Sequence, residues 1–285
     1  MRLHLFAAAF LVSGSVFAAS VSETWENLSG NGSAVITGSS SISGFTLNTA
    51  GSAAPYSSIG STSPFPGIGS TKYFVTDGSV NDWIQFDGGT IATNANTIQF
   101  AYPIRVVSFD ATDTDLDIMT LDHTAGSYTP YFNVRGNGNN LRTTNENGWP
   151  GAGSPISTTA WAAGNPNNWA TLDGGRWHLL AWLVTPSATN GTYKVWDINP
   201  LNGSATLLQS YSGAVNPTVQ ATVNRFALGL CIAASAVSNA NTVAHIDDIT
   251  FWDDAFADEA AFLNAVRTRY NVPAGASVQD WSMFE

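Results

Sequence analysis

Residues 176–184 read Arg-Trp-His-Leu-Leu-Ala-Trp-Leu-Val, and this stretch decides the fold. It is nearly continuous in apolar residues, as expected of a strand that is buried on both faces. Shorter segments elsewhere alternate apolar and polar residues or form brief apolar runs between clusters of Gly, Asn and Asp. They span residues 83–86, 97–100, 104–109, 118–121, 131–134, 192–198, 205–209, 225–232 and 245–252. Many short strands separated by turn residues predict a sandwich of two antiparallel sheets.

One helix is expected late in the chain, over residues 259–270. Asp258 is placed to cap its first turn, and apolar side chains recur on one face of the segment. Asn271 and Pro273 are expected to end it. The predicted fold class is therefore all-β, a two-sheet antiparallel jelly-roll sandwich with one short C-terminal helix.

Two segments resemble the laminin G-like and concanavalin A-like lectin-glucanase jelly-roll superfamily. The first is residues 175–184 with the hairpin Tyr193-Lys194-Val195-Trp196-Asp197, which is similar to the family's W-H-x-(V/L)-A-x-x-(V/I) strand. The second is His245-Ile246-Asp247-Asp248-Ile249-Thr250-Phe251-Trp252, which is similar to the closing I-D-D strand and runs into a short helix. Ile198 stands where the family usually has Gly, so this hairpin is expected to be longer. The resemblance covers residues 177–270 and implies the fold, but no particular ligand.

Residues 1–18 have the pattern of a secretory signal peptide. Arg2 supplies a positive start, residues 5–12 form a short apolar run, and Val16-Phe17-Ala18 has the small-residue pattern of a cleavage site. Residues 19–285 are then expected to form one laminin G-like domain, secreted to an extracellular or periplasmic compartment. Cys231 is the single cysteine, so no internal disulfide is expected.

The chain is acidic and poor in charge. Only 11% of its 285 residues are charged, against roughly 25% in average soluble domains, and its formal net charge is −11. An acidic surface repels nucleic acid, and no apolar stretch is long enough to insert into a membrane, so neither is an expected partner. A polar surface made mostly of amides and hydroxyls suits neutral sugars. We therefore expect a carbohydrate-binding, lectin-like protein that recognises an extracellular polysaccharide or glycan, and the oligomeric state stays open.

A structural calcium ion is the expected cofactor. Ca²⁺ takes six to eight oxygen ligands from carboxylates and carbonyls, and the acidic excess favours a cation. Secreted sugar-binding modules that the chain resembles hold one ion between an early Glu and a late Ile-Asp-Asp, which implies Glu26, Asp247 and Asp248 as ligands here. Because successive residues of a strand face opposite ways, one of the two aspartates is expected to face solvent or a neighbouring loop. The alternative is a set of solvated or hydrogen-bonded acids.

Ten tryptophans supply flat apolar surface, on which sugar rings stack. Trp177, Trp182 and Trp196 lie on predicted strands, so core packing is expected for them. The predicted sugar site lies instead in residues 145–173, a region rich in Asn, Gly and Pro whose aromatics are expected to be partly exposed. Its residues are Trp149, Trp161, Trp169, Asn165 and Asn168. The alternative for these aromatics is a hydrophobic plug under a long loop.

The sequence leaves open whether the protein is an enzyme. The alternative function is a polysaccharide lyase or glycoside hydrolase on the same scaffold, with His123, Tyr131, Arg135 and Asp115 as candidate catalytic residues. In the jelly-roll lyases that these residue types resemble, Arg neutralises a uronate carboxylate and Tyr or His moves the proton. Asp115 belongs to an acidic run over residues 110–122, whose carboxylates would be spaced like a glycosidase pair if the run were extended. A solvated loop is the other interpretation of that run.

Overall fold

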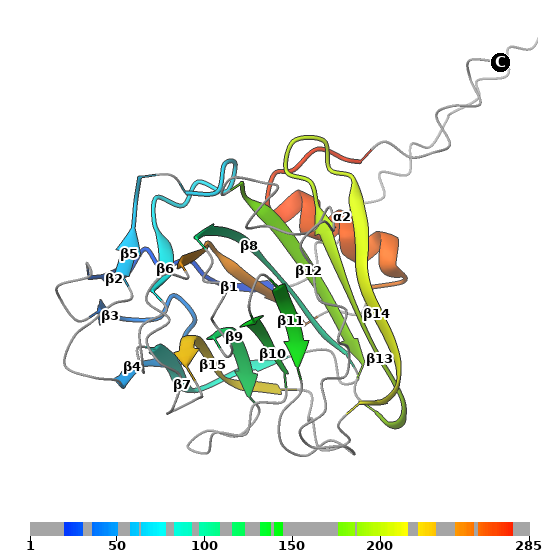
Figure 1. Ribbon diagram of the computed structural model, residues 1–285, viewed down its shortest axis with the longest axis horizontal. Coiled ribbons are helices and arrows are strands. Elements are labelled where there is room, and N and C mark those ends of the chain that lie inside the picture. Colours follow the sequence, from blue (N-terminus) through cyan, green and yellow to red (C-terminus); the bar gives the residue numbers. More distant parts are fainter. Residues whose placement is uncertain are drawn as a thin grey trace, which may run out of the picture.

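The structure is a computed structural model. It describes residues 20–30, 36–50, 58–62, 64–77, 83–92, 97–108, 116–122, 132–137, 140–144, 176–185, 187–215, 222–231, 243–253 and 256–275. Within these ranges the chain forms two antiparallel sheets that pack face to face and one helix on the outside (Figure 1). The predicted all-β sandwich with a late helix is confirmed.

The larger sheet has nine strands in the part of the chain that is described. Their order is β14-β13-β12-β8-β16-β6-β5, with β17 paired to β8 and β1 paired to β17. The bounds are β1 Ser20–Glu23, β5 Ser58–Gly60, β6 Tyr73–Asp77, β8 Ile98–Ser108, β12 His178–Thr185, β13 Ser187–Ile198, β14 Ala205–Val215, β16 Val243–Ile246 and β17 Ile249–Trp252. Strand β12 carries the apolar run and lies between β8 and β13. One face packs in the core between the sheets and the other, through Leu179 and Ala181, in the outer cluster, so both faces are buried along most of the strand as its sequence predicts.

The smaller sheet has six strands among the described residues, in the order β11-β10-β9-β15-β7-β4. Their bounds are β4 Thr46–Ala50, β7 Trp83–Ala92, β9 Leu116–Asp122, β10 Phe132–Asn137, β11 Asn140–Thr144 and β15 Thr222–Cys231. Strands β2 Leu28–Ser29 and β3 Thr37–Gly38 form a separate short pair.

Aromatic rings fill the space between the two sheets. Phe86 of β7 stacks on Phe226 of β15 at a centroid distance of 4.6 Å, and Phe226 lies 6.2 Å from Phe251 of β17 on the opposite sheet. These side chains are fully buried, as is Trp182. Each close aromatic pair contributes about 0.5–1.5 kcal/mol beyond the burial of apolar area. The inner face of the sandwich is therefore held by ring packing rather than by charge.

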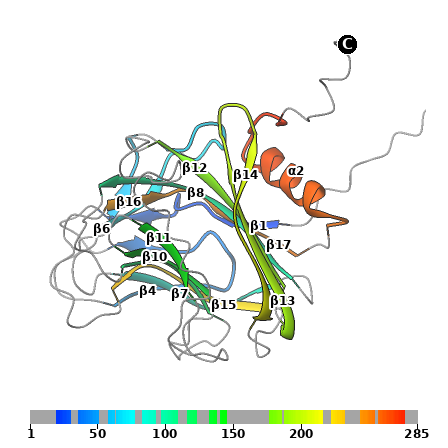
Figure 2. The ribbon, with the colours of Figure 1, turned by 45° about the vertical axis from the view of Figure 1, so that its right-hand side comes forward.

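The outer face of the larger sheet is also covered. Figure 2 shows helix α2, Glu259–Arg269, on one side of this sheet and the smaller sheet on the other. Phe262 of the helix meets Trp252 edge to face at 5.8 Å and lies 6.3 Å from Trp196. Trp177 belongs to the same outer cluster. The predicted core roles of Trp177, Trp182 and Trp196 are thus confirmed, because all three side chains are buried.

The ends of α2 are set by the residues that its sequence indicates. The Asp258 carboxylate accepts a hydrogen bond from the backbone N–H of Ala261 at 2.8 Å, which satisfies one of the free donors of the first turn. At the other end Asn271 takes a left-handed φ of 50°. This lets the N–H of Val272 reach the carbonyl of Arg267 at 2.9 Å, which closes the last turn in a Schellman motif.

Residues 97–100 and 104–109, expected as separate segments, join into the single strand β8 across Pro103. Pro103 has no N–H to give to a neighbouring strand, and opposite it the chain leaves the ladder at Asp247 and Asp248, between β16 and β17. The carbonyl of Pro103 still accepts a bond from Asp247 N–H at 3.0 Å. The Ile-Asp-Asp segment is therefore a two-residue break, not part of a continuous strand.

Candidate functional site

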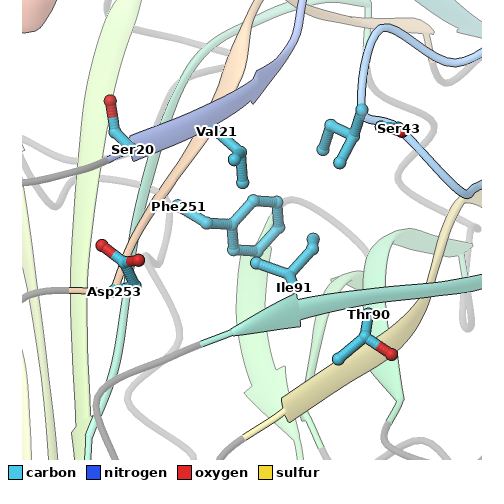
Figure 3. A pocket seen from close by; sticks show the side chains of 8 residues that line it. Ser20, Val21, Ser43, Thr90, Ile91, Phe251 and Asp253 are labelled. Atoms are coloured by element: carbon cyan, nitrogen blue, oxygen red, sulfur yellow. The ribbon is translucent and has the colours of Figure 1, made fainter.

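A pocket of about 240 Å³ opens at the edge of the sandwich, where the ends of both sheets meet. It is lined from β1, from the turn before β4, from the end of β7 and from β17. Figure 3 shows the ring of Phe251 at its centre, with Val21 and Ile91 beside it. Its remaining lining residues are Ser20, Ile42, Ser43, Thr90 and Asp253.

The pocket separates apolar from polar groups. Its walls are the side chains of Phe251, Ile91 and Ile42, all buried, together with Val21, which is 43% exposed. Hydroxyl and carboxylate groups of Ser20, Ser43, Thr90 and Asp253 complete the lining. A sugar ring has apolar C–H faces and a polar rim of hydroxyls, so this division of the lining matches one ring. The volume is below the roughly 300–1,000 Å³ of sites for drug-sized ligands, which favours one ring over several.

Asp253 gives the pocket its charge. The residue is exposed and directly follows β17, and it forms no ion pair with any cationic side chain that the structure describes. An ionised carboxylate only accepts hydrogen bonds, and bonds to a charged acceptor are about twice as strong as neutral ones. Asp253 is therefore the group best suited to fix the orientation of a hydroxylated ligand.

Of the predicted metal ligands, Glu26 bonds Thr71 and Lys72, directly after Ser70, which bonds Asp247. The Glu26 carboxylate accepts hydrogen bonds from the backbone N–H groups of Thr71 and Lys72 and from the Thr71 hydroxyl. The Lys72 ammonium lies 2.7 Å from the carbonyl oxygens of Glu26 and of Leu28. The Lys72 side chain therefore places a positive charge beside these two carbonyl oxygens.

The aspartate pair corrects one expectation from the sequence. Asp247 and Asp248 were expected to lie on a strand and face opposite ways, with one toward solvent or a neighbouring loop. Neither faces solvent, since their exposed fractions are 0% and 2%, although Asp247 does bond the 65–70 segment. The alternation of a strand does not apply, because the two residues form the break opposite Pro103. Asp247 accepts bonds from Phe65 N–H at 2.6 Å and the Ser70 hydroxyl at 2.9 Å, while Asp248 pairs with Arg269 of α2 at 3.0 Å. The pair fastens the 65–70 segment and the helix to the sheet.

Burial controls the acidity of these carboxyls. It raises the pKa of Asp247, and it raises the pKa of Asp248 to about 7 with help from the charge of Asp247, against the opposing effect of Arg269. Burial likewise raises the pKa of Glu23, whose carboxylate accepts bonds from Trp25 N–H and Ser41 N–H. Among the residues that the structure describes, no group of three or more His, Cys, Asp or Glu side chains is arranged to hold a metal ion. Calcium binding stays a prediction.

The predicted sugar residues Trp149, Trp161, Trp169, Asn165 and Asn168 lie outside the described residues, and so do the candidate catalytic residues His123, Tyr131 and Asp115. Arg135 lies on β10. There its Cα is opposite Arg142 of β11 on one side and Asp117 of β9 on the other. The structure therefore brings three charged positions to adjacent strands, although the sequence analysis had singled out only one of them as catalytic.

The pocket residues were missed by sequence reasoning. They come from four segments that are as much as 233 positions apart, near strand ends and in the turn before β4, where no local pattern marks them. The one available signal was Asp253, an acid directly after an apolar closing strand.

The described part of the chain contains no helix long and apolar enough to cross a membrane.

No protein-family model and no curated protein matches the chain. Among solved structures, the binding domain of Paraclostridial Mosquitocidal Protein 1 is similar with a TM-score of 0.50 at 14% identity, over 87% of this chain and 53% of that one. A structure concerning the interaction of botulinum neurotoxin type C with two ganglioside molecules has a TM-score of 0.49 at 9% identity, over 88% and 51%. The binding domain of botulinum neurotoxin DC in complex with SialylT has a TM-score of 0.48 at 10% identity, over 82% and 49%. The chain spans about half the length of each, and the likeness to the mosquitocidal protein is one of fold.

Proposed function

We propose that this chain is a carbohydrate-binding protein and that the pocket at the edge of the sandwich holds one sugar ring of an extracellular polysaccharide or glycan. The observation that carries the proposal is the lining of the pocket, with Phe251, Ile91 and Val21 as apolar walls and Asp253 among its polar groups. Of the apolar walls, Val21 is 43% exposed and is the side chain that the C–H face of a ring can cover, whereas Phe251 and Ile91 are buried. The polar groups accept or donate bonds to the hydroxyls of the ring.

Three further features support the same proposal. The chain has little charge, so its polar surface consists mostly of groups that hydrogen-bond neutral sugars. Its fold is similar to a domain that is called a binding domain in a mosquitocidal protein. Residues 1–18 have the pattern of a secretory signal, so we place the protein outside the cytoplasm and, by its strand motifs, in the laminin G-like superfamily.

The experiment begins with a panel of polysaccharides and glycans, scored for retention of the protein and for release of products. Asp253→Asn removes the carboxylate of the pocket, and Ser43→Trp fills its volume. Since hydrogen bonds to charged groups are worth about 1.5–3 kcal/mol, we expect Asp253→Asn to weaken binding by about tenfold or more. Ser43→Trp should abolish it.

Asp258→Asn is the matched control. It also removes one exposed acidic charge, and Asn remains a good helix cap, so affinity and melting temperature should stay unchanged. If wild-type protein is retained by no member of the panel, or if both pocket variants bind like wild type, the proposal is wrong. Release of products by the wild type would instead identify an enzyme.

A further inference from the structure

Arg105 lies in a cross-strand row on the outer face of the larger sheet. Its Cα is opposite His245 of β16, which is in turn opposite Val75 of β6. Trp177 precedes β12 and continues the row on the other side, since His178 is opposite Ile104. Phe251 of the sugar pocket is opposite Phe100, five residues earlier on β8. At a rise of about 3.3 Å per residue, Arg105 is thus roughly 17 Å from the pocket.

The guanidinium of Arg105 is held by aromatic rings. Its central carbon lies 4.9 Å from the ring centroid of Trp177 and 5.4 Å from that of Tyr73. These rings are fixed in turn: Tyr73 meets Trp177 edge to face at 6.0 Å and stacks on His245 at 4.7 Å. Two cation–π contacts to packed rings give the guanidinium a defined position before any ligand arrives.

One hydrogen bond orients the guanidinium further. Arg105 Nε donates to His245 Nδ1 at 2.8 Å, so that nitrogen of the imidazole carries no proton. Burial, and secondarily the charge of Arg105, lower the pKa of His245 to about 4, so the imidazole is neutral at pH 7. His245 therefore holds the arginine in place without adding charge.

Arg105 differs from four other basic residues in having no oxygen partner among the residues that the structure describes. Lys72 binds two backbone carbonyls, Lys194 pairs with Glu259, Arg267 binds the carbonyl of Gly203, and Arg269 pairs with Asp248. The two terminal amino groups of Arg105 make no hydrogen bond or ion pair to any residue that the structure describes. The side chain is partly exposed, and Val107, on the same face of β8, is 52% exposed, so solvent reaches this end of the sheet.

We propose that Arg105 is an anion-binding site that takes a carboxylate or sulfate group of an extracellular ligand. Its free edge presents parallel N–H donors, which match two oxygens of one anionic group in a bidentate pair. Trp177 and Tyr73 keep that edge in position, and the partial burial of the site strengthens the attraction. The site is separate from the sugar pocket and does not depend on the function proposed for it.

The test measures binding of glucuronate, of inorganic sulfate and of glucose by calorimetry at constant ionic strength. Wild-type protein should bind glucuronate, sulfate or both, and it should bind glucose more weakly at this site. Arg105→Lys keeps the charge but loses the planar donor edge, so we expect about a tenfold loss. Arg105→Gln should abolish anion binding. Arg267→Gln, which changes a partly buried arginine that is engaged by the Gly203 carbonyl, should bind like wild type.

Circular dichroism confirms that each variant is folded, and Arg105→Lys keeps the test valid if Arg105→Gln fails to fold. Preference for glucuronate identifies a carboxylate ligand, and preference for sulfate identifies a sulfate ester. The proposal is overturned if neither anion binds wild-type protein, or if folded Arg105 variants bind both anions as tightly as wild type does. Loss of sugar binding in the pocket variants would leave this result unchanged, which keeps the two proposals separate.

Discussion

Substituting Tyr270 with Phe tests how the break at Asp247 and Asp248 is stabilised. Tyr270 caps the end of α2 and its side chain is fully buried. Its hydroxyl lies 2.7 Å from the carbonyl oxygens of Ala101 and of Asp248, and 3.1 Å from the hydroxyl of Thr250. These groups belong to the break and to the strands beside it, where the regular ladder of hydrogen bonds is interrupted. One side-chain hydroxyl thus bonds backbone groups of both β8 and the break.

The magnitude follows from what the substitution removes. Phe keeps the ring, so no cavity forms, and the loss is confined to the hydroxyl. A hydroxyl has one proton and donates to one carbonyl at a time. A buried acceptor left without a donor costs about 1–3 kcal/mol. The substitution removes that one donor, so we expect Tyr270→Phe to lower the free energy of unfolding by about 1–3 kcal/mol, or the melting temperature by roughly 2–12 °C.

Denaturant unfolding followed by tryptophan fluorescence measures this change. Tyr73→Phe is the control, because its hydroxyl contacts the Thr62 hydroxyl at 3.2 Å in a partly buried position, and its loss should cost under about 1 kcal/mol. The reasoning fails if Tyr270→Phe unfolds within about 0.5 kcal/mol of wild type, since the two carbonyls would then have other partners.

Three further predictions concern the acidic residues. Because burial raises the pKa values of Glu23, Asp247 and Asp248, the folded protein binds more protons than the unfolded chain. The stability from these groups is full below about pH 4 and is lost as the pH rises through their folded-state pKa values, and the pKa of Asp248 is about 7. Asp248→Asn should flatten this slope in thermal unfolding. A calcium ion held by Glu26 or by the aspartate pair would raise the melting temperature on addition of calcium and lower it with a chelator; no shift with either refutes the metal. Asp258→Ala removes the cap of α2 and should destabilise the protein by about 1 kcal/mol in denaturant unfolding, whereas Asp258→Asn should not.

The sequence predicts those parts of the fold that depend on local pattern. The apolar run of β12, the alternating segments of β7 and β13, and the capped helix α2 are readable because burial imposes a period on each of them. The directions in which the Asp247 and Asp248 side chains point could not be predicted from the two-residue period of a strand. They depend on Pro103, which is 144 positions earlier and lies opposite the pair only once the sheet has formed.

The candidate site could not be predicted either, because it also depends on residues that are far apart in the sequence. Val21, Ile91 and Phe251 each look like ordinary core residues in their own segments. Val21 and Phe251 are cross-strand partners in the larger sheet, and the pocket arises only where Ile91 of the smaller sheet comes beside them. Arg105 presents the same problem on the outer face. In sequence it is one charge between apolar residues of a strand, and only the fold shows that no described residue gives it an oxygen partner.

The scarcity of charge gives the two proposed sites different salt dependences. Lys72, Lys194, Arg267 and Arg269 bind oxygens of the chain itself, so Arg105 is the described basic side chain best placed for an external anion. Its attraction works through a partly exposed charge and should weaken as salt rises, because the Debye length falls from about 10 Å at 0.1 M to about 3 Å at 1 M. A neutral sugar in the pocket of Phe251 and Asp253 is held by apolar contact and hydrogen bonds, which salt screens little. A ligand carrying both a neutral ring and an acidic group would therefore keep part of its affinity in 1 M salt only if the pocket contributes to binding.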